Sequence, residues 1–590
     1  MQPAWPLPDA GKSARLVLDT RIGDEIIALA GEILAHRFPI FGGVVDTGAE
    51  IDWHRDYRSG KISGLEFSRR VRYLDFASVG DSKWTWELNR HQHLIVLAQA
   101  FRLTGRHEFL AEIEAQIVGW TARNPFVRGI NWASALEVAF RALSWMWVDH
   151  LAGSELRPEI RLLLQNGLWF HARHLEVNLS TYFSPNTHLL GEAVALHAIG
   201  VNYPAMPGAA GFARTGGRLV EEQLEFQVRG DGSHFEQSTY YHVYALDFFL
   251  FHYLLAGRPA SMKSRLGKMA EYLGAVIGPS RRLFFLGDDD GGRFFHPYGE
   301  RDLFARATLA TCALALPGSD ICFEERDALV QAAWWVGDVA EPRDERRSGG
   351  SRNFADSGLV TLVNGPVQVL FDAGPFGWSG AGHSHADALE ILVRHGDRVL
   401  LGDAGTFVYT ADIAQRNWFR GTAAHNTVVI DGRDQATPVT PFRWEDKPVV
   451  RLMGVGNGYA DAECEYGGFV HRRTVLLCAA RACVVLDRIT GPAGEHAVEQ
   501  VWNGEMLTSA PQMMRQAWRS ECYGTRGAIE QTVASKRGEF PMVMAAALVF
   551  GDGAGALSLA MEAGACVVQV AGITAVFPDS GEPRWSETVT

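Results

Sequence analysis

The stretch AEPRDERRSGGS, residues 340–351, separates two halves of the chain that differ in their sequence pattern. It is charged, rich in glycine and without hydrophobic periodicity, which is typical of a linker. Before it, segments such as residues 91–105 and 133–153 place apolar residues three and four positions apart, the spacing of amphipathic helices. After it, short β-branched runs such as residues 358–363 and 473–480 are separated by Gly, Asp and Asn turns. Runs of this kind are typical of an antiparallel sandwich.

These patterns predict an all-α domain followed by an all-β domain. The helical domain is predicted at residues 81–340, the linker at 341–351 and the β-sandwich domain at 352–590. Residues 1–80 have a weaker pattern and are predicted to form an arm packed on the helical domain. A chain of 590 residues is much longer than one hydrophobic core requires, so two or more domains are expected.

Composition argues against several classes of protein. The formal net charge is −13 and no basic stripe is visible, so nucleic acid is not an expected partner. The most apolar late stretch, residues 542–577, is interrupted by acidic residues and glycines, so no membrane helix is expected. The seven cysteines lack CxxC spacing, which predicts neither a disulfide framework nor a zinc ribbon. No signal peptide is recognised, so the expected location is cytoplasmic, or periplasmic or secreted if an export segment has been removed.

Residues 181–196, TYFSPNTHLLGEAVAL, contain a helix start. Ser184 is the predicted N-cap and Pro185 the first helical residue, which places Asn186 and His188 in the first turn. The unpaired amides and the helix dipole make such a turn suitable for an anion, for example a carboxylate. The alternative interpretation is that Asn186 only caps the helix and His188 only packs.

Residues 229–255 contain a Gly-Asp-Gly turn and then an aromatic helix that includes Tyr240, Tyr241 and His242. A tyrosine can serve as proton donor and acceptor if nearby cations lower its pKa. Adjacent aromatic residues at a helix start are also common as core or sugar-stacking residues. The composition of this segment therefore leaves both roles open.

The strongest local signal is GHSHADALEILV, residues 382–393. On a strand, His383 and His385 would project from the same face. Asp403 and His425 follow at distances suited to neighbouring antiparallel strands. Two histidines and one carboxylate are a good ligand set for zinc or a similar divalent ion, and one of the paired histidines would then be left for another role. A metal-free polar cluster is the alternative.

The order SPNTHLLGE, DGSHFEQSTYYH, GHSHAD, GDAGT and FRGTAAHN on an α-then-β chain resembles the heparinase II/III-like polysaccharide lyases. The resemblance covers most of residues 50–490, and heparinase III-like and broad-specificity glycosaminoglycan lyases look closest. It implies an incomplete (α/α) toroid followed by an antiparallel β-sandwich domain. The implied reaction is β-elimination at a uronic acid, with hyaluronan, chondroitin sulfate, heparan sulfate or heparin as favoured substrates and 4,5-unsaturated oligosaccharides as products.

The resemblance also implies roles for single residues. Asn186 would neutralise the uronate carboxylate, Tyr241 would transfer the proton, and His383 would be a second acid/base group. A divalent ion, Zn²⁺ or Mn²⁺, would have a structural role, and no organic cofactor is expected. Its implied ligands are His385, Asp403 and His425. The residues predicted to contact the acidic polysaccharide are His188, Tyr240, Trp132, Arg90, Arg141, Tyr409, Arg416 and Arg420.

Other interpretations remain open at the level of sequence. The substrate could be alginate or a bacterial exopolysaccharide, and the chain could form a homo-oligomer. A glycoside hydrolase would use two carboxylates, for which Glu192 and Asp288 are candidates, although residues 286–293 around Asp288 are predicted to be only a turn. A third interpretation is a polysaccharide-binding protein without catalytic activity.

Overall fold

The structure is a computed structural model that describes residues 3–182, 184–295, 301–318, 321–339, 350–551 and 555–587. The chain forms two compact units. Unit 1 comprises Met1–Val228, Val243–Ala270 and Gly291–Glu345, and unit 2 comprises Arg229–His242, Glu271–Asp290 and Arg346–Thr590. Residues 341–349 of the predicted linker lie outside the described residues.

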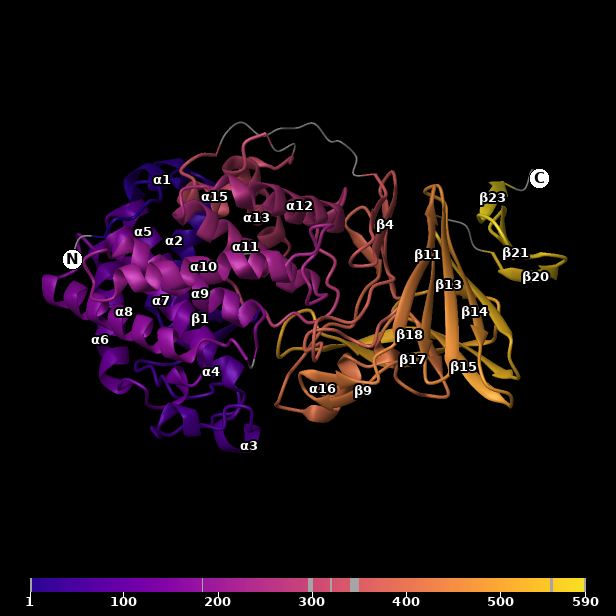
Figure 1. The fold of residues 1–590 in the computed structure, drawn as a ribbon, viewed down its shortest axis with the longest axis horizontal. Helices are drawn as coiled ribbons and strands as arrows, with labels where there is room; N and C mark the ends of the chain where they lie inside the picture. The colour runs from indigo at the N-terminus through magenta and orange to yellow at the C-terminus, as the bar shows by residue number, and fades with distance from the viewer. Residues whose placement is uncertain are drawn as a thin grey trace. The chain divides into compact units, whose positions relative to one another are not determined.

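Unit 1 consists mainly of helices and also contains a hairpin of strands β1 and β2 (Figure 1). Helices α11 and α12 each begin in one unit and end in the other. The elements of this part of the chain are α1 (Ala10–Val17), α2 (Arg21–Leu34), β1 (Arg37–Ile40), β2 (Gly43–Asp46), η1 (Ser68–Arg70), α3 (Phe76–Val79), α4 (Ser82–Asn89), α5 (Gln92–Thr104), α6 (His107–Arg123), η2 (Ile130–Trp132), α7 (Ala135–Ala152), α8 (Pro158–Asn178), α9 (Thr187–Asn202), α10 (Ala209–Gln227), α11 (Thr239–Leu255), α12 (Ala260–Ile277), α13 (Arg301–Ala315), α14 (Glu325–Val330) and α15 (Ala332–Trp335).

Helices α5, α7 and α9 are buried along almost their whole length, which explains why their sequences are apolar on nearly every side. Helix α10 packs against α9 at very short distance. A Cβ atom on Gly200 would lie 2.3 Å from the backbone nitrogen of Ala213, and one on Gly216 would lie 2.4 Å from that of His197. Glycine is therefore required at both contacts, because any side chain would force the two helices apart.

Unit 2 contains the antiparallel sheets. Three larger sheets have the strand orders β3-β4-β5-β6-β7, β17-β18-β15-β8 and β11-β12-β13-β14-β19-β16, and a fourth has the order β20-β21-β22-β23. The elements are β3 (Arg352–Phe354), β4 (Leu359–Asn364), β5 (Val367–Asp372), β6 (Ile391–His395), β7 (Arg398–Leu401), α16 (Ile413–Phe419), η3 (Thr422–Ala424), β8 (Val428–Ile430), β9 (Thr437–Thr440), β10 (Arg443–Glu445), β11 (Val449–Gly456), β12 (Tyr459–Tyr466), β13 (Phe469–Cys478), β14 (Ala482–Thr490), β15 (His496–Trp502), β16 (Leu507–Thr508), β17 (Gln512–Arg519), β18 (Gly527–Gly538), β19 (Met542–Val549), β20 (Ser558–Glu562), β21 (Ala565–Val570), β22 (Ile573–Pro578) and β23 (Arg584–Glu587).

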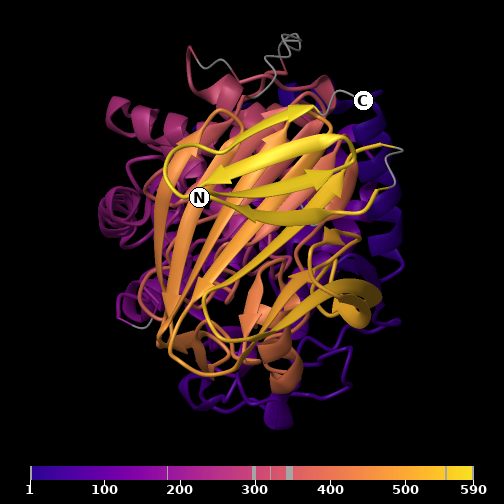
Figure 2. The ribbon, with the colours of Figure 1, turned by 90° about the vertical axis from the view of Figure 1, so that its right-hand side faces the viewer.

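The sheet β11-β12-β13-β14-β19-β16 of unit 2 is buried on both faces. Alternate residues of β13 face opposite sides: Val475 and Leu477 join the core with β4–β8, whereas Leu476 and Cys478 join a second core with β21 and β22. Figure 2 shows β20–β23 lying across the long strands of this sheet. Burial on both faces explains why β13 has a continuous apolar run instead of an alternating pattern.

The predicted order of an all-α region followed by antiparallel sheets is confirmed. The two compact units do not coincide with the predicted boundaries, because residues 229–242 and 271–290 of the predicted helical domain belong to unit 2. The arm of residues 1–80 belongs to unit 1 and contains its own helices, α1, α2 and α3. No helix of the described ranges has the length and apolar character that crossing a bilayer requires.

Candidate functional site

Tyr241 and His383 are in direct contact within unit 2. Tyr241 lies at the start of α11, and His383 lies in the loop between β5 and β6. Their rings are stacked with centroids 3.8 Å apart and an angle of 20° between the ring planes. The Oη atom of Tyr241 also lies 3.4 Å from the Oη atom of Tyr409. Three predicted site residues therefore meet, although they are far apart in the sequence.

The carboxylate of Asp288 binds His383 and two further side chains, His385 and Arg416. Its Oδ2 atom accepts a hydrogen bond from Nδ1 of His383 at 3.1 Å, and its Oδ1 atom accepts one from Nε2 of His385 at 3.0 Å. Arg416 donates to both carboxylate oxygens, at 2.7 Å for the bond from Nη2 to Oδ2. Asp288 is 0% exposed, so all of these bonds are protected from water. The segment predicted to be only a turn thus supplies a central residue of the site.

Electrostatics fix the protonation of the tyrosine. Burial, with a contribution from Asp290, raises the pKa of Tyr241 well above its ordinary value. The phenol is therefore protonated at neutral pH, and the condition of a pKa lowered by nearby cations is not met. Burial lowers the pKa of His383, but the hydrogen bond to Asp288 and nearby carboxylates outweigh burial and raise that pKa overall. Because Nδ1 of His383 is bonded to Asp288, Nε2 is the nitrogen left to exchange a proton with a ligand.

The two predicted arginine contacts of unit 2 point inward. Arg416, on α16, is 0% exposed, pairs with Asp288 and lies 4.8 Å from the ring centre of Tyr409. Arg420 is 1% exposed and donates to backbone oxygens of Pro441 and Thr440. The donors of both arginines are used inside the unit, and their contact with substrate stays a prediction. Arg416 orients residues of the site.

Four side chains form a group that can hold a metal ion: His385, Asp387, Asp403 and His425. One ligand atom from each lies within 4.8 Å of all the others. The predicted triad is thus brought together, and the sequence analysis missed Asp387. Residues 382–388 form a loop, so the condition of a strand at this motif is not met. Ala381 and Leu389, which flank the loop, have φ +54° and +63°.

The chemistry of these residues fits a cation. Among the described residues, Nδ1 of His385 and Nε2 of His425 are buried without a hydrogen-bond partner, whereas Nδ1 of His425 lies 2.9 Å from Oδ2 of Asp403. Glu390 lies beside them, and burial with the charge of Asp403 raises its pKa to about 8. Burial also raises the pKa of Asp387. Several buried carboxylates are costly without a compensating positive charge, and a divalent ion would supply it.

Asn186 lies in unit 1 and begins α9 as its N-cap. Its Oδ1 atom accepts a hydrogen bond from the backbone nitrogen of His188 at 3.0 Å. The prediction of Ser184 as N-cap and Pro185 as first helical residue is therefore wrong, since the helix starts at Thr187. The side-chain oxygen of Asn186 is used by the cap, which leaves its amide NH₂ group to donate to an anion.

Three further predicted substrate contacts of unit 1 have structural roles. Arg90 is 2% exposed, and its guanidinium donates to Glu137 and Glu87. Arg141 is 0% exposed and donates to Nε2 of His171 and to backbone oxygens. Trp132 is buried and packs against the rings of Trp120, Phe126, His171 and His174. The polar atoms or rings of these three residues are enclosed by unit 1 itself, and their contact with substrate stays a prediction.

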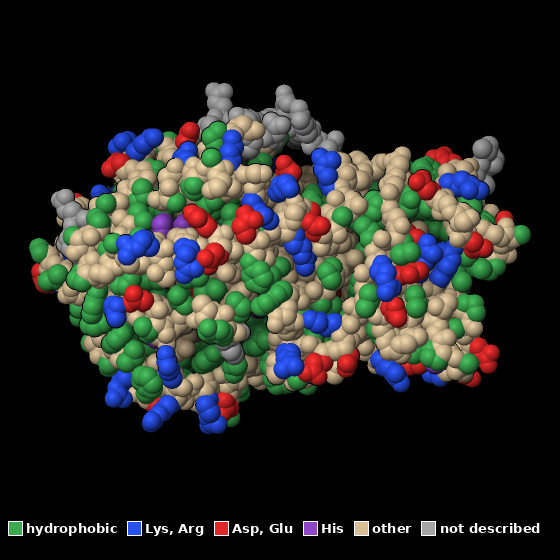
Figure 3. Space-filling model, viewed as in Figure 1, with side chains coloured by type: hydrophobic (Ala, Val, Ile, Leu, Met, Phe, Trp, Pro, Cys, Tyr) green, Lys and Arg blue, Asp and Glu red, His purple; other side chains and the backbone are tan. Residues whose placement is uncertain are grey.

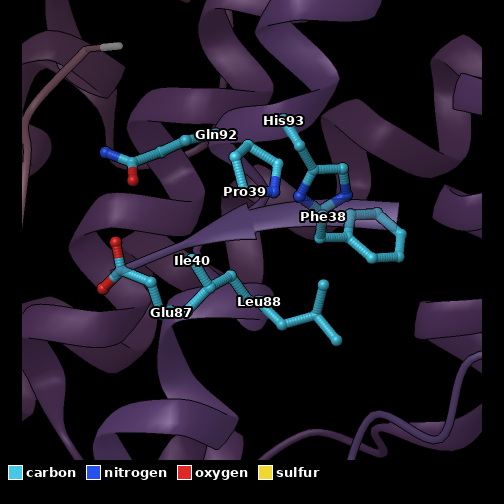
Figure 4. Close-up of a pocket in the computed structure, with 7 residues that line it drawn as sticks. All are labelled: Phe38, Pro39, Ile40, Glu87, Leu88, Gln92 and His93. Atoms are coloured by element: carbon cyan, nitrogen blue, oxygen red, sulfur yellow. The ribbon is translucent and has the colours of Figure 1, made fainter. Parts of the chain in front are cut away.

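Tyr240 is 5% exposed, with its ring centre 6.3 Å from that of Phe285, and His188 is half-buried near Glu137. A separate small pocket of unit 1 is lined by Phe38, Pro39, Ile40, Glu87, Leu88, Gln92 and His93 (Figure 4). Its volume of about 10 Å³ has room for about one water molecule. None of the predicted site residues lines it, so we assign it no ligand.

The carboxylate pair proposed for a hydrolase is not available for acid/base chemistry. Glu192 is 0% exposed and accepts hydrogen bonds from the backbone nitrogen and Oγ of Ser180, both at 2.7 Å. Asp288 is held by Arg416 and two histidines, and burial is outweighed by the arginine so that its pKa lies well below the ordinary value. A buried carboxyl and a paired carboxylate do not match the two roles that glycoside hydrolysis requires.

Glu192 instead predicts a pH dependence of stability. Burial raises its pKa from 4.5 to about 8, so between these values the folded chain holds a proton that the unfolded chain has lost. Its contribution is therefore complete below about pH 4.5 and disappears as the pH rises to about 8. We expect the melting temperature of Glu192→Gln to fall less than that of the wild type between pH 5 and pH 8. Identical slopes for the two proteins would contradict this.

Two family models match the chain: "Heparinase II/III N-terminus" over residues 15–288 and "Heparinase II/III-like, C-terminal" over residues 346–556. A heparin-sulfate lyase of Bacteroides stercoris is 23% identical over 509 residues, which cover 80% of this chain and 69% of that protein. A heparin-sulfate lyase of Pedobacter heparinus is 24% identical over 502 residues, which cover 79% of this chain and 66% of that protein. This chain thus spans about two thirds of the length of these relatives.

Solved structures show the same fold. A crystal structure of heparinase III aligns with a TM-score of 0.68 at 17% identity, covering 97% of this chain and 92% of that one. The chondroitin AC lyase of Streptomyces coelicolor A3 aligns with a TM-score of 0.55 at 14% identity, covering 97% and 88%. These likenesses confirm the predicted fold class, an incomplete (α/α) toroid followed by an antiparallel β-sandwich domain.

Proposed function

The chain belongs to the heparinase II/III family, and we propose that it is a polysaccharide lyase that cleaves a uronic-acid-containing glycosaminoglycan by β-elimination. The observation that carries the proposal is the stacking of His383 on a protonated Tyr241, whose Oη atom faces that of Tyr409. Two heparin-sulfate lyases among the relatives support a glycosaminoglycan as the substrate class. Alginate and bacterial exopolysaccharides are the alternative substrates to be tested beside it.

The elimination needs a proton acceptor at C5 of the uronate and a proton donor at the glycosidic oxygen on C4. The C5–H electrons form the C4–C5 double bond while the C4–O bond breaks. Tyr241 is protonated and suited to donate the proton that the leaving oxygen requires. His383 keeps Nε2 for proton exchange, because its Nδ1 atom is bonded to Asp288, and we assign it the C5 proton. Neutralising the uronate carboxylate lowers the barrier to removal of that proton, and the amide group of Asn186 is our candidate for this role.

We further propose that His385, Asp387, Asp403 and His425 hold a structural Zn²⁺ or Mn²⁺ ion. Mixed imidazole and carboxylate ligands suit both ions. When bound, the ion would neutralise the buried carboxylates and brace the loop that carries His383. The residues that contact substrate would then keep their positions through the ion's ligands.

Net charge does not favour a polyanionic substrate, since the chain carries −13. On the face in Figure 3, basic and acidic side chains are interspersed instead of being separated by sign. Long-range attraction is therefore weak, and recognition must depend on local groups. We expect binding of the polysaccharide to depend less on salt than it would for a protein with a large basic surface.

The test is to incubate the protein with heparan sulfate, heparin, chondroitin sulfate, hyaluronan and alginate, and to follow ultraviolet absorbance and reducing ends in the same samples. Only elimination creates a C4–C5 double bond conjugated to the carboxylate, so a lyase raises both signals. Reducing ends without absorbance would identify a hydrolase and overturn the proposal. The polymer that responds would define the substrate.

A further inference from the structure

We propose that Asp288 is a positioning residue that couples the proton-transferring group to the metal-ligand group. This inference rests on the proposed function for its catalytic part and on the contacts of Asp288 alone for its metal part. Neither part follows from a sequence motif, because Asp288 lies in a Gly-Asp-Asp-Asp-Gly segment typical of a turn.

The side chain of Asp288 lies between the two histidines of the same loop. Its Oδ2 atom accepts a hydrogen bond from Nδ1 of His383, the acid/base candidate. Its Oδ1 atom accepts one from Nε2 of His385, a metal-ligand candidate. A hydrogen bond at Nε2 of His385 leaves Nδ1 of that ring to bind the ion, and this atom has no aligned hydrogen-bond partner among the described residues. One carboxylate thereby fixes which nitrogen each ring presents to its own ligand.

The backbone of Asp288 extends the coupling to the tyrosine. Its nitrogen donates to the oxygen of His383 at 2.8 Å, and its oxygen accepts from Oγ of Ser238 at 2.7 Å. The same Oγ atom accepts from the backbone nitrogen of Tyr241 at 3.2 Å. Asp288 is therefore linked by hydrogen bonds to the loop of His383 and to the helix start of Tyr241.

Arg416 holds the carboxylate itself in place. Its two terminal nitrogens donate to the two oxygens of Asp288, which fixes the plane of the carboxylate as well as its charge. With both oxygens occupied by an arginine and a histidine each, Asp288 cannot act on substrate. Its role is to hold other groups, and small displacements of such groups are known to cost about 100-fold in rate.

The test is Asp288→Asn, which keeps the size but puts a donor where an acceptor is needed. At saturating Zn²⁺ we expect kcat to fall about 100-fold with KM changed less than threefold, because chemistry and not substrate binding is affected. We also expect the dissociation constant for Zn²⁺, measured by competition with a chelator, to rise about tenfold. Replacing a purely structural residue would lower stability without lowering kcat selectively over KM.

The matched control is Asp149→Asn in unit 1. Asp149 is also buried, and it accepts hydrogen bonds from Arg161, Gln165 and Tyr203. We expect this variant to lose stability but to keep kcat and Zn²⁺ affinity within threefold of the wild type. If Asp288→Asn does not fold, the variant to use is Arg416→Lys, because it keeps the charge and removes the bidentate contact with Asp288. A loss of kcat of about tenfold in this variant supports the proposal.

A folded Asp288→Asn protein with wild-type kcat, or a loss of kcat equal to that of Asp149→Asn, overturns the catalytic part. An Arg416→Lys protein with wild-type kcat overturns it as well. Unchanged Zn²⁺ affinity overturns the coupling to the metal group. If the wild type has no lyase activity on any of the polysaccharides, the proposed function fails, and the chelator competition still decides the metal part.

Discussion

Replacing Tyr241 by phenylalanine is expected to lower kcat by about a thousandfold while KM and the melting temperature stay close to wild type. The change removes only the hydroxyl group, and the ring that stacks on His383 remains. Because the phenol is protonated at neutral pH, its loss removes the proton donor for the leaving oxygen. Initial rates of absorbance increase at several substrate concentrations separate kcat from KM.

The control for this variant is Tyr253→Phe, which removes a hydroxyl from another buried tyrosine of α11. We expect it to keep wild-type kinetics. Tyr409→Phe tests the neighbouring hydroxyl, 3.4 Å from that of Tyr241. Near-normal turnover in Tyr241→Phe together with lost turnover in Tyr409→Phe would move the donor role to Tyr409.

Replacing His425 by alanine is expected to abolish stoichiometric metal binding and to destabilise unit 2 by about 4 kcal/mol. His425 is fully buried, and its Nδ1 atom lies 2.9 Å from Oδ2 of Asp403. Without the histidine and the ion, the carboxylates of Asp387, Asp403 and Glu390 would lose their compensating charge. Elemental analysis of the purified protein gives the metal content, and thermal unfolding gives the stability.

His395→Ala is the matched control, since His395 is an exposed histidine at the end of β6 in the same unit. It should bind metal and unfold like the wild type. A chelator should lower the melting temperature of the wild type to that of His425→Ala and leave the variant unchanged. Equal metal content in His425→Ala and wild type would refute the site.

The sequence predicted the order of the two kinds of structure, and several of its candidate site residues lie together in unit 2. Three separate segments bring together Tyr241, His383 and Tyr409. A second group contains His385, Asp403 and His425. Their motifs are short and contain unusual residues at fixed spacing, which is why they can be recognised without a structure. The order of helices before strands followed from hydrophobic periodicity, because helices and strands bury their faces with different periods. The toroid was implied by the family resemblance.

The contacts that the sequence did not indicate join segments that are distant along the chain. Asp288 and Arg416 are 128 positions apart, so neither the turn-like context of the first nor the charge of the second indicates their pairing. Arg90 and Arg141 lie on helix faces that look suited to a polysaccharide, but the packing of unit 1 encloses both. The sequence pattern places a charge on a face, and only the tertiary structure decides which neighbour that face meets.

The assignment of residues 229–242 and 271–290 to unit 2 bears on how this protein can be divided. A fragment that begins at Gly350 would contain all four residues of the candidate metal site and every strand from β3 onward, yet it would lack Tyr241 and Asp288. The complementary fragment would contain those two residues without His383. Neither fragment contains all the residues proposed for the elimination, so neither should be active alone. Activity should return only when the two fragments reassociate. A chimaera made at this boundary would need both fragments from the same or closely matched proteins.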